Sequence, residues 1–250
     1  MIKDSSINKK LIDFYHRHKD IPLPERESEF LPEVLIPCYN HGKFLESALK
    51  SIPKDISITI INDSSTDNTL EIIQELKSKY SFKLINNETN LLQYASINKA
   101  INLSANNLFY ILNADDILLP DWIQYSLNIL KENSSIYMVG GQGIGFRNEN
   151  VPDSEIISDK QKIPLSYRIY CQEEIYKINN IRYFKLAFSG TAFLRSSWNH
   201  IGGLFPFSKR VCSADDRDFQ MRMLCFFNIL ISDKVSSLLR TDSSTQAGQI

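Results

Sequence analysis

The sequence predicts an α/β fold with a mostly parallel sheet flanked by helices, formed as a single domain. Two observations point to this fold class. Short apolar runs rich in β-branched residues alternate with longer segments whose apolar residues recur at helical spacing. Polar residues follow each of these runs, as they do where strands end. Parallel neighbours need a crossover between them, and a helix after each strand supplies it.

The first half of the chain repeats this pattern four times. The runs that predict strands cover residues 33–37, 56–61, 82–85 and 108–112. The second run, ISITII, is nearly continuous in β-branched residues, which is typical of a strand buried on both faces. Helical spacing predicts helices over residues 44–52, 66–76 and 93–103, and a further helix that begins at Pro120.

The alternation is lost after residue 135. Strands are expected at residues 136–146, which glycines interrupt, and at 191–195 and 229–239. A polar loop is expected at 148–162, and residues 173–185 are ambiguous, with a helix as one alternative. A helix begins at the cluster Asp215, Asp216 and Asp218, whose carboxylates could simply complement the positive end of the helix dipole.

Residues 1–30 are predicted to be an N-terminal helical appendage to the domain at 31–250. A helix is expected over residues 8–19, with Leu11, Ile12 and Tyr15 on one side. Prolines then break the chain before the first strand. The helix either packs on the domain or lies with its basic side on an acidic membrane surface, and the sequence leaves both alternatives open.

Composition and charge exclude several classes of protein. Lysine plus arginine number 28 and aspartate plus glutamate 29, so the net charge of −1 gives no field for nucleic acid, and no such partner is expected. Hydrophobic residues make up 43% of the chain, which excludes a disordered one. The four cysteines form no CxxC pair, and neither a signal peptide nor a membrane-spanning run is visible. We therefore expect a cytoplasmic protein, with peripheral association at the inner face of the membrane as the open alternative.

The ends of the predicted strands are the expected ligand site, because ligands of parallel sheets bind there. The four ends read Cys38-Tyr39-Asn40, Asn62-Asp63-Ser64, Asn86-Asn87 and Asn113-Ala114-Asp115-Asp116. The first turn, PCYNHG, contains a single glycine. The sequence therefore has neither the dinucleotide fingerprint nor a Walker A loop at this position.

Asp63 and Asp115 suggest a divalent cation at this edge of the sheet. Carboxylate oxygens are the ligands that Mg²⁺ and Mn²⁺ prefer, and such a cation neutralises a nucleoside diphosphate. Each residue also has a purely structural alternative. Asp115 and Asp116 could form a turn and a helix cap, Asp63 could form a turn, and Tyr39 could belong to the core.

At these motifs the chain resembles the inverting family 2 glycosyltransferases of the GT-A fold, a Rossmann-like α/β architecture. The matching stretches occur in the family's order between about residue 33 and about residue 239: PEVLIPCYN, ITIINDSSTDNT, NLLQYASINKAI, YILNADDILLPDWI, and IGGLF followed by SADDRDFQMRM. The resemblance implies transfer of a sugar, most often from a UDP-sugar, to an acceptor hydroxyl with inversion. It also implies Mn²⁺ or Mg²⁺ as cofactor and a glycan or lipid-linked acceptor, as in bacterial surface glycan synthesis.

The resemblance assigns roles to particular residues. Residues 31–135 would form the nucleotide-sugar-binding half and residues 136–250 the acceptor-binding half. Donor-binding residues would be Pro37, Tyr39, Asn40, Asp63, Asn90, Asn98, Asn113 and Asp115, with Asp63 on the uracil edge and Asp115 holding the metal. Asp216 would be the catalytic base, with Asp215 beside it. Gly202 and Gly203 would belong to the acceptor loop.

Some positions depart from the family's pattern. Asn113 replaces the first aspartate of the DxD motif, and Asp215 replaces a glutamate. The segment NLLQYASIN lacks the glycine and arginine common there, and no histidine follows Leu239, where some relatives place one near the metal. Asn113 therefore favours the rival hypothesis of a non-catalytic domain that binds a glycan or a partner enzyme, whereas Asp63, Asp115 and Asp216 oppose it.

A nucleotidyltransferase is the third hypothesis, and it would need a glycine-rich basic first loop that this chain lacks. Three further residues are assigned no part in catalysis. Trp122 and Trp198 are expected to pack in the core, and His200 is expected at the surface.

Overall fold

The computed structural model describes residues 5–147, 167–170, 186–212 and 214–242. The first half contains four strands, β1 (Pro32–Cys38), β2 (Ser57–Asn62), β3 (Lys83–Asn86) and β4 (Leu108–Ile111). They are joined by the helices α2 (Gly42–Lys50), α3 (Thr69–Leu76) and α4 (Leu92–Leu103). All three strand pairings among them are parallel, as the alternating pattern predicts.

The rest of the chain extends the same sheet with a mixture of strand directions. Its elements are β5 (Ile117–Leu118), α5 (Trp122–Glu132), β6 (Ile136–Phe146), β7 (Tyr167–Tyr170), β8 (Ala192–Leu194), α8 (Arg195–Ile201), the 3₁₀ helix η2 (Phe207–Lys209), α9 (Asp215–Leu224) and β9 (Asn228–Arg240). In the described chain the sheet order is β3-β2-β1-β4-β8-β6-β9-β5, with β7 also paired to β9. β8 runs antiparallel to β4 and β6, and both β5 and β7 run antiparallel to β9.

Several second-half predictions can be compared with these elements. The strands expected at 136–146, 191–195 and 229–239 are confirmed as β6, β8 and β9, and α9 begins at the acidic cluster. β5 and β7 were not predicted. The expected polar loop at 148–162 and the ambiguous segment at 173–185 lie outside the described residues.

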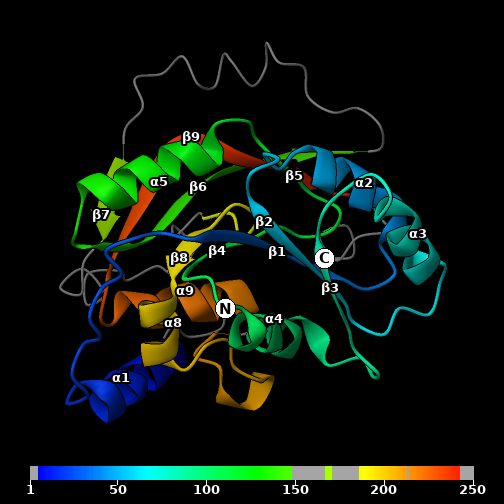
Figure 1. Ribbon diagram of the computed structural model, residues 1–250. Coiled ribbons are helices and arrows are strands. Elements are labelled where there is room, and N and C mark those ends of the chain that lie inside the picture. The colour runs from blue at the N-terminus through cyan, green and yellow to red at the C-terminus, as the bar shows by residue number, and fades with distance from the viewer. Residues whose placement is uncertain (1–4, 148–166, 171–185, 213, 243–250) are drawn as a thin grey trace.

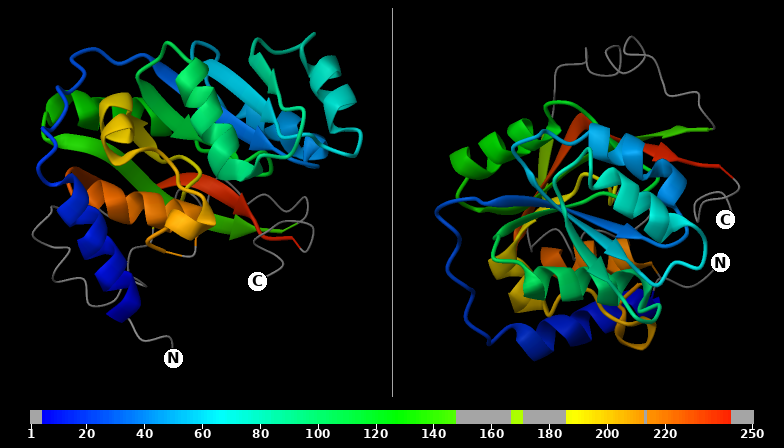
Figure 2. Two further views of the ribbon diagram at one scale, coloured as in Figure 1. Left: turned by 90° about the horizontal axis from the view of Figure 1, so that it is seen from below. Right: turned by 45° about the vertical axis from the view of Figure 1, so that its right-hand side comes forward.

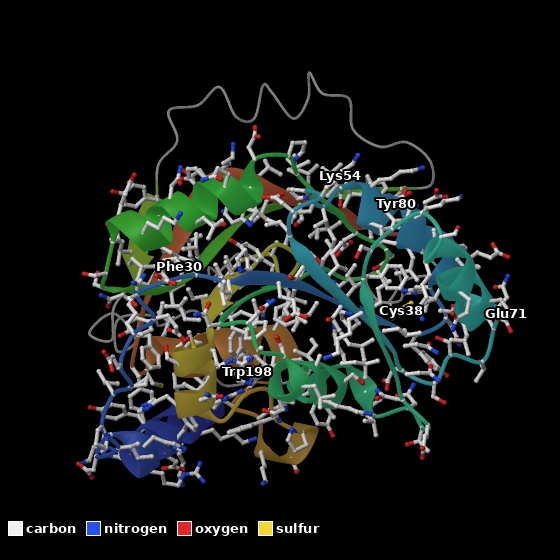
Figure 3. The ribbon with its side chains drawn as sticks, viewed as in Figure 1. Phe30, Cys38, Lys54, Glu71, Tyr80 and Trp198 are labelled. Atoms are coloured by element: carbon white, nitrogen blue, oxygen red, sulfur yellow. The ribbon has the colours of Figure 1, made fainter. Side chains whose placement is uncertain are left out.

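Helices cover both faces of the sheet (Figure 1). In β1, Val34 and Ile36 pack into the core beneath α2, α3 and α5, while Leu35 faces the opposite core. That opposite core also receives side chains from α4, α8, α9 and the N-terminal helix α1 (Ser5–His18). Trp198 of α8 is buried there (Figure 3), and Trp122 is buried on the other face, so both tryptophans are the packing residues expected.

The described N-terminal residues are fastened to the domain. Leu11 and Phe14 of α1 are buried, and α1 lies beside α9 (Figure 2). Arg26 donates hydrogen bonds to carbonyls at the end of α5 and the start of β6. Glu27 accepts the backbone amide and the hydroxyl of Ser196 at the start of α8. The apolar side of α1 thus packs on the domain, which is the first of the two alternatives.

Among the helices of the described ranges, none has the length and hydropathy needed to cross a membrane. His200 does not lie free at the surface as expected. Its ring is partly buried against Phe226 and Phe227, and this burial lowers the pKa of His200 below its ordinary value.

An ion pair inside α9 fixes the chain that precedes this helix. Arg222 donates to Asp218 at 2.8 Å, and the two side chains are 0% and 1% exposed. Asp218 also accepts the backbone amide of Val211. Arg222 donates further to the carbonyls of Ile201 at 2.8 Å and Gly203 at 2.6 Å. A buried charge needs this many partners, so the pair and the loop at residues 202–212 hold each other in place.

Replacing Arg222 should therefore be strongly destabilising. Arg222→Ala leaves the Asp218 carboxylate buried without its counter-charge, which typically costs about 3 to 5 kcal/mol. The free energy of unfolding in urea measures this loss. Arg217→Ala on the same helix is the matched control, because Arg217 is exposed and its loss should cost about 0.5 kcal/mol or less. A cost for Arg222→Ala as small as the control's would contradict the role given to the ion pair.

Candidate active site

The carboxyl ends of the parallel strands meet at one edge of the sheet. Cys38 at the end of β1 (Figure 3) lies opposite Asn62 of β2, and Asn62 lies opposite Asn86 of β3. The backbone pairing continues one residue past β2 and β3, from the Asp63 amide to the Cys38 carbonyl and from the Asn87 amide to the Asn62 carbonyl. The polar residues that follow these strands are therefore neighbours in space, as the sequence predicts.

Asp63 is buried and held by three hydrogen bonds to one oxygen. Oδ1 accepts the Asn87 amide group at 2.8 Å, the Ser96 hydroxyl at 2.8 Å and the Leu91 backbone amide at 2.9 Å. Lys99 in turn donates to Asn87 at 2.8 Å. The second oxygen, Oδ2, receives no hydrogen bond from the described part of the chain. The carboxylate is thus rigidly oriented with one acceptor position left for a ligand, which is more than a turn requires.

The loops after β1 and β2 are tied to each other. Asn40 accepts the backbone amide of Thr66 at 2.8 Å, and its side-chain amide donates to the Thr66 hydroxyl at 3.2 Å. Tyr39 beside it is 44% exposed and so is not a core aromatic. Pro37 is the half-buried penultimate residue of β1. Asn40 thus shapes the loop, while Tyr39 presents its ring at this edge of the sheet.

Backbone strain gathers at the same edge. Three of the four non-glycine residues with positive φ in the described chain lie here: Asn40 and Ser64 in the loops after β1 and β2, and Leu92 at the first position of α4, with φ values of 56°, 60° and 68°. The left-handed region costs a leucine on the order of 1 kcal/mol, and such outliers cluster at functional sites. Leu92 belongs to the segment NLLQYASIN, which lacks the glycine that the family has there. The strain supports the interpretation of this edge as the site.

Asp116 is the most constrained carboxylate in the site. It is 4% exposed, and Oδ2 accepts the Ser189 hydroxyl at 2.5 Å and the Asn113 side-chain amide at 3.0 Å. Oδ1 accepts the backbone amide of Arg240 at 2.9 Å. Burial, and then the charge of Asp115, raise the pKa of Asp116 to about 7 against the effect of these donors. Both oxygens of Asp116 are therefore used in structural hydrogen bonds, and its distant partners Ser189 and Arg240 carry no local sequence signal.

Asp115 is in the opposite situation. It is 9% exposed, and no described residue donates a hydrogen bond to its carboxylate from a side chain. Burial raises the pKa of Asp115, the charges of His41 and Arg240 oppose that rise, and the charge of Asp242 adds to it. A buried carboxylate with a second carboxylate nearby and no side-chain donor from the described residues is suited to binding a cation. In the described ranges, however, no group of three or more acidic, histidine or cysteine side chains forms a complete metal cage.

The predicted asparagines lie in different environments. Asn113 accepts from Gln93 at 2.9 Å as well as donating to Asp116. Asn90 is exposed, and its oxygen accepts the backbone amide of Leu92, which makes a local turn. Asn98 points away from these residues and binds the backbone of Leu204. Of the three, Asn113 is the one that belongs to the DxD segment and bonds to its carboxylates, through Asp116.

Asp215 and Asp216 begin α9, on the face of the sheet that also carries α4. Asp215 forms an ion pair with Arg210 of the preceding loop. Asp216 is partly exposed and accepts only the adjacent Arg217 backbone amide, at 2.7 Å, from the described residues. One carboxylate of the pair is therefore neutralised, and the other remains available to a ligand.

A mixed sheet with helices on both faces and this polar carboxyl edge defines a protein of the GT-A glycosyltransferase fold. The chain belongs to Glycosyl transferase family 2, whose family model matches residues 33–197. It is 26% identical to a chondroitin synthase of Escherichia coli, a match that covers 87% of this chain and 30% of that protein. It is 32% identical to a poly-beta-1,6-N-acetyl-D-glucosamine synthase of Staphylococcus epidermidis over 43% of this chain and 27% of that protein. The chain thus spans about a third or less of the length of these two relatives.

Solved structures support the same fold. A structure of Staphylococcus aureus TarS 1–349 in complex with UDP-GlcNAc matches with a TM-score of 0.63 and 17% identity, over 88% of this chain and 61% of that one. The mannosyltransferase PcManGT of Pyrobaculum calidifontis, in complex with GDP-Man and Mn²⁺, matches with a TM-score of 0.59 and 15% identity. That match covers 95% of this chain and 66% of the other. At these identities the likeness concerns the fold.

The raised pKa of Asp116 predicts a pH-dependent stability. Its pKa rises from the ordinary 3.8 to about 7 on folding, so between these values the folded state holds a proton that the unfolded state has lost. Stability should fall as pH rises from about 4 to about 7, by on the order of a few kcal/mol, and this contribution should stay constant above pH 7.

Urea unfolding in EDTA at a series of pH values measures this dependence. Asp116→Asn is the reference because it lacks the titrating group, so the wild type should lose stability relative to it across that window. A difference between the two proteins that does not change with pH would contradict the prediction.

Proposed function

We propose that this protein transfers a sugar from a UDP-sugar to a hydroxyl of a glycan or lipid-linked acceptor, in the synthesis of a bacterial surface glycan. The observation that carries the proposal is the pair of carboxylates at the sheet edge. Asp63 keeps one oxygen for a ligand, and Asp115 has no bonded side-chain donor in the part of the chain that the structure describes. The names of the relatives support it, since they describe polysaccharide synthases, and so does the UDP-GlcNAc bound in a protein of the same fold.

The donor nucleotide would lie across the loops after β1 and β2. Asp63 Oδ2 would accept the N3–H of uracil, a charge-assisted bond that cytosine, which lacks this proton, does not offer. The exposed ring of Tyr39 would stack on the base, and Pro37 and Asn40 would hold the shape of the loop beneath it. Asn90 would lie at the rim of this pocket, because its side chain is exposed.

The residues around Asp115 fit a divalent cation that is shared with the donor. Mg²⁺ and Mn²⁺ are commonly held by one or two carboxylates together with substrate phosphates, so an incomplete protein cage is what such a site needs. Asp115 would hold the ion, and Asp242 lies near enough for its charge to raise the pKa of Asp115. When bound, the ion would stabilise the negative charge on the departing diphosphate.

The acceptor would be activated at the start of α9. Asp216 would remove the proton from the acceptor hydroxyl, whose oxygen attacks the anomeric carbon of the sugar. The bond from that carbon to the diphosphate breaks on the opposite side, so UDP leaves and the configuration is inverted. Asp215, which is paired with Arg210, would orient the acceptor.

Asn113 does not oppose catalysis once its surroundings are considered. It donates to the buried Asp116 carboxylate and accepts from the Gln93 amide. An aspartate here would place a second negative oxygen against Asp116 and would lose the donated bond. The asparagine is thus explained by its neighbours, which weakens the case for a non-catalytic glycan-binding domain.

Cation-dependent UDP binding tests this function. Calorimetry with UDP should show at least about tenfold tighter binding with 1 mM Mn²⁺ present than with EDTA, because Asp115 would hold an ion whose charge attracts the diphosphate. In Asp115→Asn this enhancement should disappear. Asp55→Asn is the matched control, since Asp55 is exposed and precedes β2 at the opposite edge of the sheet. Equal UDP affinity with and without the cation in the wild type would rule out the proposed metal site.

The two carboxylates of α9 should differ in their effect on transfer. Asp216→Asn cannot accept a proton, so it should bind UDP normally yet lose transfer by about 10² to 10⁴-fold, the usual contribution of a positioned general base. Asp215→Asn should lose less, since it removes an ion pair rather than the base. A UDP-release assay with a panel of UDP-sugars and glycan acceptors measures both. Near-full activity of Asp216→Asn beside an inactive Asp215→Asn would exchange the two roles.

A further inference from the structure

Lys99 of α4 gives its ammonium group to a side-chain amide and not to a carboxylate. Its Nζ donates to Asn87 Oδ1 at 2.8 Å. The side chain of Lys99 is partly buried, and among the described residues none forms an ion pair with it. A cation that is partly withdrawn from water without a counter-charge costs free energy, which a charge-assisted bond to the amide offsets.

The Asn87 amide is used at both ends, so its orientation is fixed. Asn87 follows β3 directly and is 3% exposed. Its Nδ2 donates to Asp63 Oδ1 at 2.8 Å and to Ser96 Oγ at 2.8 Å. Turning the amide over would put its oxygen against the Asp63 carboxylate and its NH₂ group against the Lys99 ammonium. Only the observed orientation satisfies both charges, so Asn87 bridges the cation and the carboxylate.

The bridge holds one particular oxygen of Asp63. Ser96, which is fully buried, also donates to Oδ1 at 2.8 Å, and Ser96 and Lys99 lie three residues apart on the same side of α4. Hydrogen bonds that follow one another in a buried site polarise one another. Lys99 therefore strengthens the bond from Asn87 to Asp63, and the carboxylate cannot turn without breaking that bond.

A carboxylate that cannot turn is able to distinguish two pyrimidines. N3 of uracil carries a proton that Asp63 Oδ2 can accept, whereas N3 of cytosine presents a lone pair that repels the same oxygen. Cytosine does carry an amino group at C4, and a carboxylate free to turn could accept a hydrogen bond from it. The fixed orientation of Asp63 thus disfavours cytosine as well as favouring uracil, and specificity is the difference between the two affinities.

We infer that Lys99 is a positioning residue for recognition of the base: by holding the Asn87 amide, it keeps Asp63 turned so that Oδ2 meets the N3–H of uracil and not the amino group of cytosine. The statement about the base rests on the proposed function, whereas the bridge from Lys99 to Asp63 does not. Lys99 acts through Asn87 and needs no contact with the nucleotide.

Calorimetry of the full chain with UDP and with CDP, both in Mn²⁺, tests this inference. The two nucleotides share the ribose and the diphosphate, so the ratio of their affinities reports on the base. In Lys99→Met, which removes the charge but keeps an unbranched side chain, the preference for UDP should fall about three- to tenfold, the usual worth of one hydrogen bond. Lys99→Arg keeps a cationic donor and should restore most of the preference. Lys131→Met, at an exposed position of α5, is the control and should behave as the wild type.

A double-mutant cycle shows whether Lys99 acts through Asn87. In an Asn87→Ala background, Lys99→Met should have no further effect on the preference, because the bridge is already absent. The backbone amide of Leu91, which donates to Asp63 Oδ1 at 2.9 Å, gives a readout without nucleotide. Its hydrogen exchange should be faster in Lys99→Met, since the oxygen that accepts it is held less firmly.

Two results would overturn the inference: an unchanged preference for UDP in Lys99→Met, or fully additive effects in the cycle. A wild type that binds UDP no more tightly than CDP would refute uracil recognition in the proposed function, and with it the role of Lys99 in selectivity. Faster exchange of the Leu91 amide in Lys99→Met would still establish the bridge. If the methionine variant does not fold, Lys99→Gln, which is also neutral, takes its place in every comparison.

Discussion

The burial of the Asp116 carboxylate is the constraint on which the site depends. A buried carboxylate must be supplied with donors, and those of Asp116 come from both halves of the chain: Asn113 from the end of β4, Ser189 from before β8 and the Arg240 amide from the end of β9. The parallel strands and the long strand β9 are therefore joined at this point. Asp115, one residue earlier, is then the member of the pair left for a ligand.

The same logic accounts for the second pair of carboxylates. At the start of α9, Asp215 is neutralised by Arg210, and Asp216 is partly exposed with a neighbouring amide as its only donor among the described residues. Asp215 pairs with Arg210 of the preceding loop, and Asp116 accepts from the distant Ser189 and Arg240 as well as from the nearby Asn113. Which aspartate of each pair is occupied therefore depends on how the chain folds around it. A one-residue shift would exchange the structural and the proposed chemical roles, which explains why adjacent carboxylates cannot be assigned by spacing alone.

The sequence was sufficient for the parallel half of the sheet and much less so for the rest. Short apolar runs predict β1 to β4, and apolar residues at helical spacing predict the helices between them. Both patterns depend on local burial. The two-residue strand β5 and the strand β7 were missed, since their pairing with β9 is a long-range property. The edge that carries Asp63 and Asp115 was predicted from strand ends. The partners Ser189 and Arg240 carry no local signal. The hydrogen bonds of Asn98 to Leu204 carry none either, because they join residues 106 positions apart.

Helix α4 explains why so many of the site's departures from its family can coexist. Three side chains of this helix each form a hydrogen bond with a different neighbour: Gln93 with Asn113, Ser96 with Asp63, and Asn98 with Leu204. The amide of Asn113 can both donate and accept, so it bonds the amide of Gln93. Because both groups are neutral, they add no charge beside Asp116, the carboxylate whose pKa is already raised to about 7 by burial. The strained backbone at Leu92 begins this helix, so its cost is offset by the three contacts that follow it. The neutral pair of Gln93 and Asn113 and the leucine at the first position of α4 are therefore best understood as one adjustment of this helix and its neighbours. The adjustment leaves Asp63 and Asp115 as the carboxylates available to a ligand.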